Sequence, residues 1–236
     1  KLAIWKIRVE TSVEIPIAHV IFFKYICAIT EHTRVIDKNT LNPTIPSSTL
    51  SSLILKPHIK NYTGLELSKH AADYSRNNFN LNIVNETLDN FLDKRNLFDV
   101  VIMCDVIEHL DNPFSIISKI EKNLKKDGIF IFSTMNMDAL LPKIMRGKYH
   151  WIMPQHKFYF SNSSLKYFLK KSNMDLIKIK SDARLISVEY LLFKLCVFLP
   201  KVDFIFRFFL KFNFIKEITA KINLFDLNIY FAKKIE

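Results

Sequence analysis

The sequence has 236 residues and carries 34 Lys and Arg against 23 Asp and Glu, a formal net charge of +11. Its 49% hydrophobic residues exclude an intrinsically disordered chain, and its three glycines (Gly64, Gly128 and Gly147) exclude glycine-rich phosphate loops and collagen-like segments. The positive charge favours anionic partners. No cluster of Lys and Arg interleaved with aromatic residues indicates a nucleic-acid partner, and we expect none.

The three cysteines, Cys27, Cys104 and Cys196, are far apart and odd in number. They form neither a disulfide framework nor a zinc-binding pattern, which favours a reducing, cytoplasmic compartment. The most apolar early stretch, residues 15–30, is interrupted by a histidine and a lysine and lacks a basic leader. We expect it to be neither a signal peptide nor a membrane span.

From residue 61 onwards, strands and helices are expected to alternate. Residues 61–67 (NYTGLEL) predict a strand that ends in an acid, and Ser68 can cap the following helix, Lys69 to about Phe79. Residues 81–84 predict a second strand. The nearly continuous apolar run at 98–104 (FDVVIMC) is typical of a strand buried on both faces of a parallel sheet.

The next helix is expected to begin at Asp111-Asn112-Pro113, because proline at the first helical position loses no hydrogen bond. Its apolar stripe has helical spacing and consists of Phe114, Ile117, Ile120 and Leu124. Gly128 is a natural C′ residue, so we expect the helix to stop there. Residues 129–133 then predict another apolar strand.

The last part of the chain predicts a helix from a Ser161 cap through Lys171, a strand at 176–180 and a final strand at 225–232. Strands that alternate with helices of these lengths favour an α/β fold with a doubly wound, mostly parallel sheet. We expect residues 1–236 to form a single domain. Residues 1–60 would be a divergent opening segment, and residues 185–215 a Phe-rich helical insertion before the last strand.

Ligands of open α/β sheets bind beyond the carboxyl ends of the strands. Glu66 lies at the end of the strand predicted at residues 61–67. An acid at this position can accept two hydrogen bonds from the hydroxyls of a ribose, or it can simply be a solvated loop acid. Thr87 and Leu88 follow the next strand and could border an adenine or belong to an ordinary surface loop. Cys104, at the end of the third strand, is more simply a small buried residue than a nucleophile.

His109, with acids beside it, could be a base or a metal ligand. We favour a third interpretation, in which it is a residue at the start of a helix that is hydrogen-bonded to the backbone. No metal ligands are assigned from the sequence.

Four strings, NYTGLELS, ETLD, FDVVIMCDVIEHLDNP and LKKDGIFIFSTMN, together resemble the successive motifs of class I S-adenosylmethionine-dependent methyltransferases. The nearest group includes the ubiquinone-biosynthesis O-methyltransferases, also described as the methyltransferase-domain 23 type. The resemblance covers about residues 61–182 and the last dozen residues. It implies a Rossmann-like fold with an antiparallel last strand, and methyl transfer from S-adenosylmethionine to a small or lipid-linked acceptor.

The resemblance also implies roles for residues near the cofactor. Glu66 would bind the ribose hydroxyls, and Leu67 would pack on the adenine. Thr87 and Leu88 would border the base. Cys104 would contact the methionine part of the cofactor through its backbone.

Two histidines are the candidate catalytic residues. His109 matches a Glu-His pair of the family, and His156 lies where acceptor-site residues are often found. Each would act as a base or would orient the acceptor, because many of these enzymes work chiefly by holding the acceptor atom and the methyl sulfonium in line.

The family's first motif is a strand that ends in an acid, followed by a Gly-x-Gly-x-Gly turn. Here Arg34 to Asp37 fits the strand, so Asp37 joins the predicted cofactor residues, but residues 38–43 contain no glycine. Glycine lets the backbone turn sharply and approach the cofactor. The alternative is therefore a catalytically inactive methyltransferase-fold homologue that acts as a scaffold or subunit partner. A weaker alternative is an NAD-type dehydrogenase, because an acid at the end of a strand can also bind that cofactor. Such an enzyme would need a glycine-rich fingerprint too.

The segment from Leu191 to Ile215 contains eight of the 21 phenylalanines. Within it, Asp203, Arg207 and Lys211 recur every four residues and form one polar stripe on an otherwise apolar helix. Such a helical hairpin could be a lid over the acceptor pocket, a contact with a partner subunit, or a peripheral membrane contact through residues 191–215. We favour the lid, which implies an acceptor with a bulky apolar portion.

Overall fold

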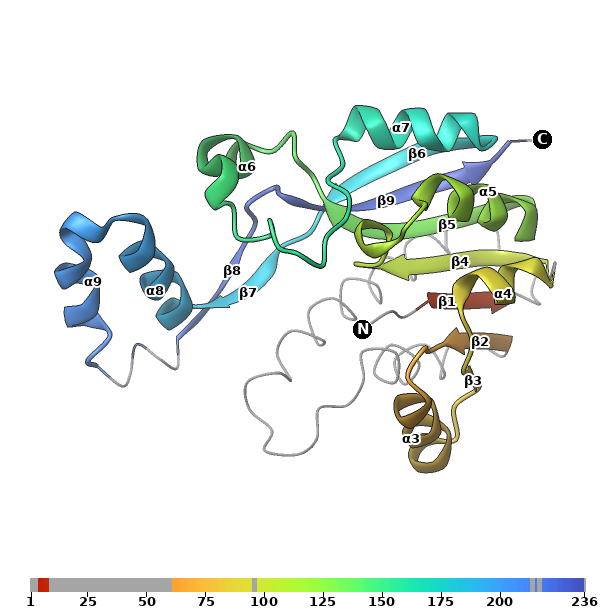
Figure 1. Cartoon of the computed structure of the whole chain (residues 1–236), viewed down its shortest axis with the longest axis horizontal. Helices are drawn as coiled ribbons and strands as arrows, with labels where there is room; N and C mark the ends of the chain where they lie inside the picture. Colours follow the sequence, from red (N-terminus) through yellow and green to blue (C-terminus); the bar gives the residue numbers. More distant parts are fainter. Residues whose placement is uncertain (1–3, 9–60, 95–96, 213–214, 216–217, 236) are drawn as a thin grey trace. The chain divides into compact units, whose positions relative to one another are not determined.

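The computed structural model describes residues 4–8, 61–94, 97–212, 215 and 218–235 (Figure 1). The chain divides into two compact units, which we call the sheet unit (Lys1–Asp182 with Phe225–Glu236) and the Phe-rich unit (Ala183–Leu224). The Phe-rich unit contains the expected insertion at 185–215. The assignment of the whole chain to one domain stays a prediction.

The sheet unit is built on a sheet whose described strands have the order β3-β2-β1-β4-β5-β9-β6. These strands are β1 (Ile4–Arg8), β2 (Asn61–Leu65), β3 (Ile83–Val84), β4 (Phe98–Cys104), β5 (Leu124–Met135), β6 (Met174–Ser181) and β9 (Leu227–Lys234). β2 pairs with β3 and β4 pairs with β5 in parallel, whereas β9 is antiparallel to both β5 and β6. The predicted α/β class, with its antiparallel last strand, is confirmed.

The strand between β2 and β4 is not one that the sequence predicted. This strand is β1, which runs antiparallel to both neighbours. The strand that we predicted at Arg34 to Asp37 lies outside the described residues. The sequence did not reveal β1 because such a short strand is held in the sheet by backbone hydrogen bonds to two partners that are far away in the sequence.

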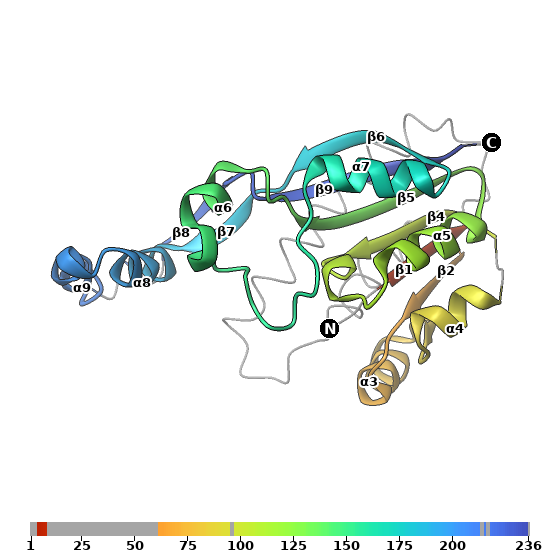
Figure 2. The same cartoon turned by 45° about the horizontal axis from the view of Figure 1, so that its top comes forward.

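The described helices of this unit are α3 (Lys69–Phe79), α4 (Leu88–Asp93), α5 (Pro113–Asn123), α6 (Leu140–Met145) and α7 (Asn162–Lys171), with 3₁₀ turns η1 (Ile107–His109) and η2 (Arg146–Lys148). The predicted caps are confirmed. Ser68 accepts from the Ala71 N–H, and Ser161 forms a capping box with Ser164. α4, α5 and α7 lie side by side along one face of the sheet (Figure 2).

The main core lies between this face and the three helices. Fully buried side chains come from β4 and β5, such as Val101 and Phe132, and from α5, such as Ile117. The ring of Phe132 stacks on Phe130 at 4.7 Å and on Tyr230 of β9 at 5.1 Å, measured between ring centroids. This packing holds β4, β5 and β9 in fixed register and so fixes the positions of the loops that follow them.

The end of α5 is earlier than predicted. The helix stops at Asn123, and Leu124 already has strand geometry and pairs with Phe98 of β4. Gly128 therefore lies inside β5 rather than at a helix end. A Cβ at Gly128 would lie 2.8 Å from the Lys125 carbonyl oxygen, so this glycine permits a close backbone approach within the strand.

In its described residues, the Phe-rich unit contains helices and a two-stranded antiparallel sheet. Its elements are β7 (Arg184–Ser187), α8 (Val188–Phe198), η3 (Pro200–Val202), α9 (Asp203–Phe209) and β8 (Thr219–Ile222). Asp203 and Arg207 of the predicted polar stripe form an ion pair of 2.7 Å. The stripe is thus an i,i+4 pair on α9, and its third predicted member, Lys211, lies in the turn after the helix, which ends at Phe209.

Candidate functional site

Four strands of the sheet end at the same edge. β2 is parallel to β3, β4 is parallel to β5, and β1 is antiparallel to both β2 and β4, so all four carboxyl ends point the same way. This edge is the usual ligand-binding edge of an open α/β sheet. It carries two groups of residues, which we call the β2–β3 cluster (Glu66, Leu67, Thr87 and Leu88) and the β4–β5 cluster (Asp105, Glu108, His109, Ser133, Thr134 and His156).

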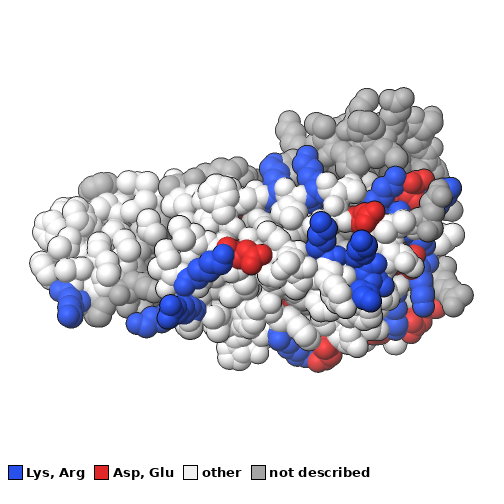
Figure 3. All heavy atoms as spheres, turned by 90° about the horizontal axis from the view of Figure 1, so that it is seen from above, with Lys and Arg blue, Asp and Glu red and all other residues white. Residues whose placement is uncertain are grey.

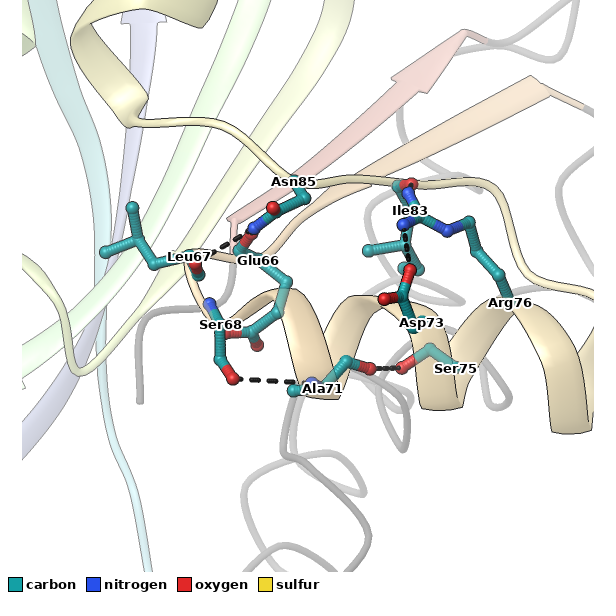
Figure 4. A network of polar contacts seen from close by, with 9 residues as sticks. All are labelled: Glu66, Leu67, Ser68, Ala71, Asp73, Ser75, Arg76, Ile83 and Asn85. Carbon is teal, nitrogen blue, oxygen red and sulfur yellow. Dashed lines mark hydrogen bonds and ion pairs between the residues drawn. The ribbon is translucent and has the colours of Figure 1, made fainter.

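Glu66 is held rigidly at the end of β2 (Figure 4). Its side chain is buried, with 6% of the residue exposed, and Oε1 accepts a hydrogen bond of 3.0 Å from the Ser68 N–H. The Asn85 side-chain amide donates to the carbonyl oxygens of Glu66 and Leu67, at 2.8 and 2.9 Å. Asn85 follows β3, so these bonds tie the loop after β3 to the loop after β2.

The other predicted residues of the β2–β3 cluster, Leu67, Thr87 and Leu88, differ in exposure and contacts. Leu67 is 47% exposed and so presents an apolar side chain beside a carboxylate. The Thr87 hydroxyl accepts from the Asn90 N–H at 3.3 Å and caps α4, and Leu88 packs against the core. Thr87 and Leu88 therefore have structural roles, and their contact with a cofactor stays a prediction.

The turn after β4 is unusual in its backbone. Asp105 has φ of 51°, in the left-handed region that a non-glycine residue adopts rarely, and its N–H donates to the Ser133 hydroxyl at 3.0 Å. The Ser133 hydroxyl in turn donates to the Asp105 carboxylate at 2.7 Å. Cys104 is half-buried and pairs with Ser133 in the sheet. The Asp105–Ser133 bonds therefore hold the turn at which the sequence predicts a cofactor contact.

Glu108 is the most strongly perturbed acid of the site. Only 3% of the residue is exposed, and the Thr134 hydroxyl donates to Oε2 at 3.0 Å. Burial and, second to it, the negative charge of Asp105 together raise the pKa of Glu108 to about 8. Its backbone carbonyl accepts from the N–H groups of Lys157 and Phe158, which brings the His156 segment to this turn.

His109 and His156 lie against each other, with ring centroids 4.7 Å apart. Each ring places Nδ1 within hydrogen-bond distance of a backbone carbonyl, His109 at 2.9 Å from Gln155 and His156 at 2.8 Å from Trp151. A carbonyl only accepts, so Nδ1 carries the proton and Nε2 of the neutral ring can accept one or bind a metal. Burial lowers the pKa of His156, and the charge of His109 adds to this, although the bond to Trp151 opposes it.

Among the residues that the structure describes, Glu108, His109 and His156 form a group with metal-binding potential. Their ligand atoms all lie within 4.8 Å of one another. Carboxylate and imidazole ligands suit a divalent cation of the first transition row. The sequence alone did not assign a metal ligand set, because His156 is separated from Glu108 by a long stretch of chain.

The structure thus brings together the two histidines that the sequence predicted, and ties Glu66 and Leu67 to the loop that carries Thr87. Asp37 lies outside the described residues. The sequence analysis missed the Glu108 carboxyl group and the two hydroxyl residues of this cluster, Ser133, which bonds to Asp105, and Thr134, which bonds to Glu108. The available signal was an acid inside an apolar string and two hydroxyl residues that interrupt the apolar end of β5.

Comparisons with known proteins agree with this architecture. Residues 49–179 match the family described as "Methyltransferase domain". The chain is 31% identical over 87 residues to a ubiquinone biosynthesis O-methyltransferase of Glaesserella parasuis serovar 5 (strain SH0165), which covers 33% of this chain and 37% of that relative. The match therefore spans well under half the length of this curated relative.

Two solved structures show the same fold at low identity. A putative methyltransferase from Bacillus halodurans is 14% identical with a TM-score of 0.56, and the match covers 79% of this chain and 88% of that chain. A methyltransferase from Thermotoga maritima, described as a possible histamine N-methyltransferase, is 16% identical with a TM-score of 0.52, over 94% and 96% of the two chains. Because the family match extends over more than half of the sequence, the chain belongs to the methyltransferase domain family.

Proposed function

We propose that this protein transfers a methyl group from S-adenosylmethionine to a small or lipid-linked acceptor. The observation that carries the proposal is the buried, anchored carboxylate of Glu66 at the end of β2. A carboxylate fixed at a strand end can accept two hydrogen bonds from the vicinal hydroxyls of a ribose. The exposed Leu67 beside it suits the apolar face of an adenine.

The β4–β5 cluster supports the acceptor half of the reaction. When bound, S-adenosylmethionine supplies an electrophilic methyl group on a sulfonium. The chain's own contribution would be to orient the acceptor and to hold the proton that it loses. Nε2 of His156 can take up a proton near neutral pH, whereas Glu108, whose pKa is about 8, holds its own proton there.

The experiment that tests the cofactor half is calorimetric titration with S-adenosylhomocysteine. We expect binding by the natural chain and at least a roughly tenfold loss of affinity in Glu66→Gln, because a charge-assisted hydrogen bond is lost while the side chain keeps its shape. Glu121→Gln is the matched control, since Glu121 is a partly buried acid on α5 that pairs with Lys234. Its affinity should equal that of the natural chain.

No binding by a folded protein would contradict the proposal and leave the catalytically inactive scaffold as the better description. Binding that Glu66→Gln does not weaken would place the cofactor elsewhere. Once binding is measured, release of S-adenosylhomocysteine from S-adenosylmethionine in the presence of candidate acceptors identifies the acceptor class.

A further inference from the structure

The Phe-rich unit exposes large apolar side chains that a water-soluble protein usually buries. Phe204 is 66% exposed and Phe208 is 55% exposed, although both are on the same helix. The exposed set includes Phe193, Phe204, Ile205, Phe208, Phe209 and Phe212. The buried apolar residues of this unit include Cys196 and Ile215. The exposed set gives the unit a large apolar surface that a partner can cover.

The exposed rings form a continuous patch rather than isolated side chains. Phe204 and Phe208 are one helical turn apart on α9, and the ring of Phe208 makes an edge contact with Phe212, with centroids 5.3 Å apart. Phe209 also contacts Phe208, at 5.8 Å between centroids. Phe193 of α8 adds to the exposed apolar surface of the same unit.

The charges around this patch are mainly positive. Lys201 and Lys211 are exposed, and the carboxylate of Asp203 is paired with Arg207 at 2.7 Å. The other acidic residue in the described part of the unit is Glu189, in the first turn of α8. In Figure 3, the described surface of the part that carries α8 and α9 in Figure 1 is largely white, with Lys and Arg atoms at its border.

We propose that the Phe-rich unit binds the surface of an anionic lipid bilayer, with the Phe204–Phe208–Phe212 row inserted among the acyl chains and Lys201 and Lys211 at the phosphates. An apolar helix face with basic side chains beside it is typical of an interfacial helix, and the long stems of Lys reach from an apolar layer to the head groups. In the described residues, no helix is long and apolar enough to cross a bilayer. The unit lies on the membrane in this proposal.

A bilayer fits better than a protein partner because the basic side chains match a negative surface over its whole area. The apolar patch also needs no complementary shape, since acyl chains adapt to protruding rings. This proposal does not rest on methyl transfer, and it would stand if the chain bound no cofactor.

The test is flotation of the full chain with vesicles of phosphatidylcholine containing phosphatidylglycerol, compared with phosphatidylcholine alone. We expect binding to the anionic vesicles and weaker binding to the neutral ones. Added salt should weaken the anionic binding, because it screens exposed charges. The Lys201→Gln/Lys211→Gln variant should lower partitioning by roughly tenfold or more, since each basic residue near the surface contributes about fivefold.

The apolar part is tested with Phe204→Ser/Phe208→Ser, at two exposed positions where the fold loses little packing. Its control is Tyr167→Ser/Ile177→Ser, which removes two exposed apolar side chains from the sheet unit. We expect loss of flotation in the first variant and retention in the second. Circular dichroism should show that both variants keep the folded state.

Three results would overturn the proposal. One is the absence of flotation with anionic vesicles. Another is flotation that Phe204→Ser/Phe208→Ser leaves unchanged. The third is a self-associated natural chain that becomes monomeric in this variant without any vesicle binding, because a second copy would then cover the patch. Titration with S-adenosylhomocysteine on the same samples reports the cofactor site independently.

Discussion

Two buried glutamates, Glu66 after β2 and Glu108 after β4, lie at the same edge of the sheet but have different surroundings. Glu66 accepts a backbone N–H from Ser68 and adjoins the exposed Leu67. The Glu108 carboxyl group accepts from the Thr134 hydroxyl and has the negative charge of Asp105 nearby. Glu66 is thus an anchored hydrogen-bond acceptor, whereas the surroundings of Glu108 raise its pKa so that it holds a proton near neutral pH. Burial alone therefore does not set the role of a carboxyl group.

The largest effect that we expect from the difference between the two glutamates is a dependence of the free energy of unfolding on pH, caused by Glu108. Glu108 has a folded pKa of about 8 against an ordinary value of 4.5. As the pH rises, Glu108 ionises first in the unfolded state. The free energy of unfolding is therefore highest below about pH 4.5 and falls as the pH rises to about 8, by up to about 5 kcal/mol. Glu108→Gln should remove this loss, so that the variant is more stable than the natural chain at about pH 9 and similar at about pH 4.

Urea unfolding at these two pH values measures this effect. A chelator in the buffer keeps metal ions from the Glu108, His109 and His156 group. Equal stability differences at both pH values would show that Glu108 does not hold its proton in the folded state.

A smaller effect is expected from Asp105→Asn. Asparagine tolerates the left-handed backbone of this position, and its amide oxygen can still accept from the Ser133 hydroxyl. Removing the charge should lower the pKa of Glu108. The total loss of stability between about pH 4 and about pH 9 should then be smaller, which the same urea measurements detect. An unchanged profile would leave burial as the whole cause.

A further test separates structural from ligand-binding roles in the β2–β3 cluster. Thr87→Ala removes the cap of α4 and should lower the free energy of unfolding by about 1 kcal/mol. Ser68→Ala removes the cap of α3 at a similar cost, but its backbone N–H still reaches Glu66. Affinity for S-adenosylhomocysteine should fall less in either variant than in Glu66→Gln.

Chemical denaturation and calorimetry on the same samples give both quantities for these cap variants. If Thr87→Ala weakens binding strongly without destabilising the fold, Thr87 contacts the cofactor and its cap is incidental.

The sequence by itself determined the elements whose signals are local. The bounds of α3 and β4 and the caps at Ser68 and Ser161 match the expectation, because a cap bond or an apolar run involves residues a few positions apart. The family also followed from the sequence, since its motifs are contiguous strings. Glu66 could be chosen because it ends a recognisable strand.

Only the tertiary structure decided what depends on distant partners. Pairing of Leu124 with Phe98 ended α5 before Gly128, and two distant strands placed β1 between them. The contact of His156 with His109 joins residues far apart in the chain, and it surrounds Glu108 with groups that its neighbours in sequence do not reveal. Burial and charge at a site are sums over all nearby segments, and a local pattern contains only one of them.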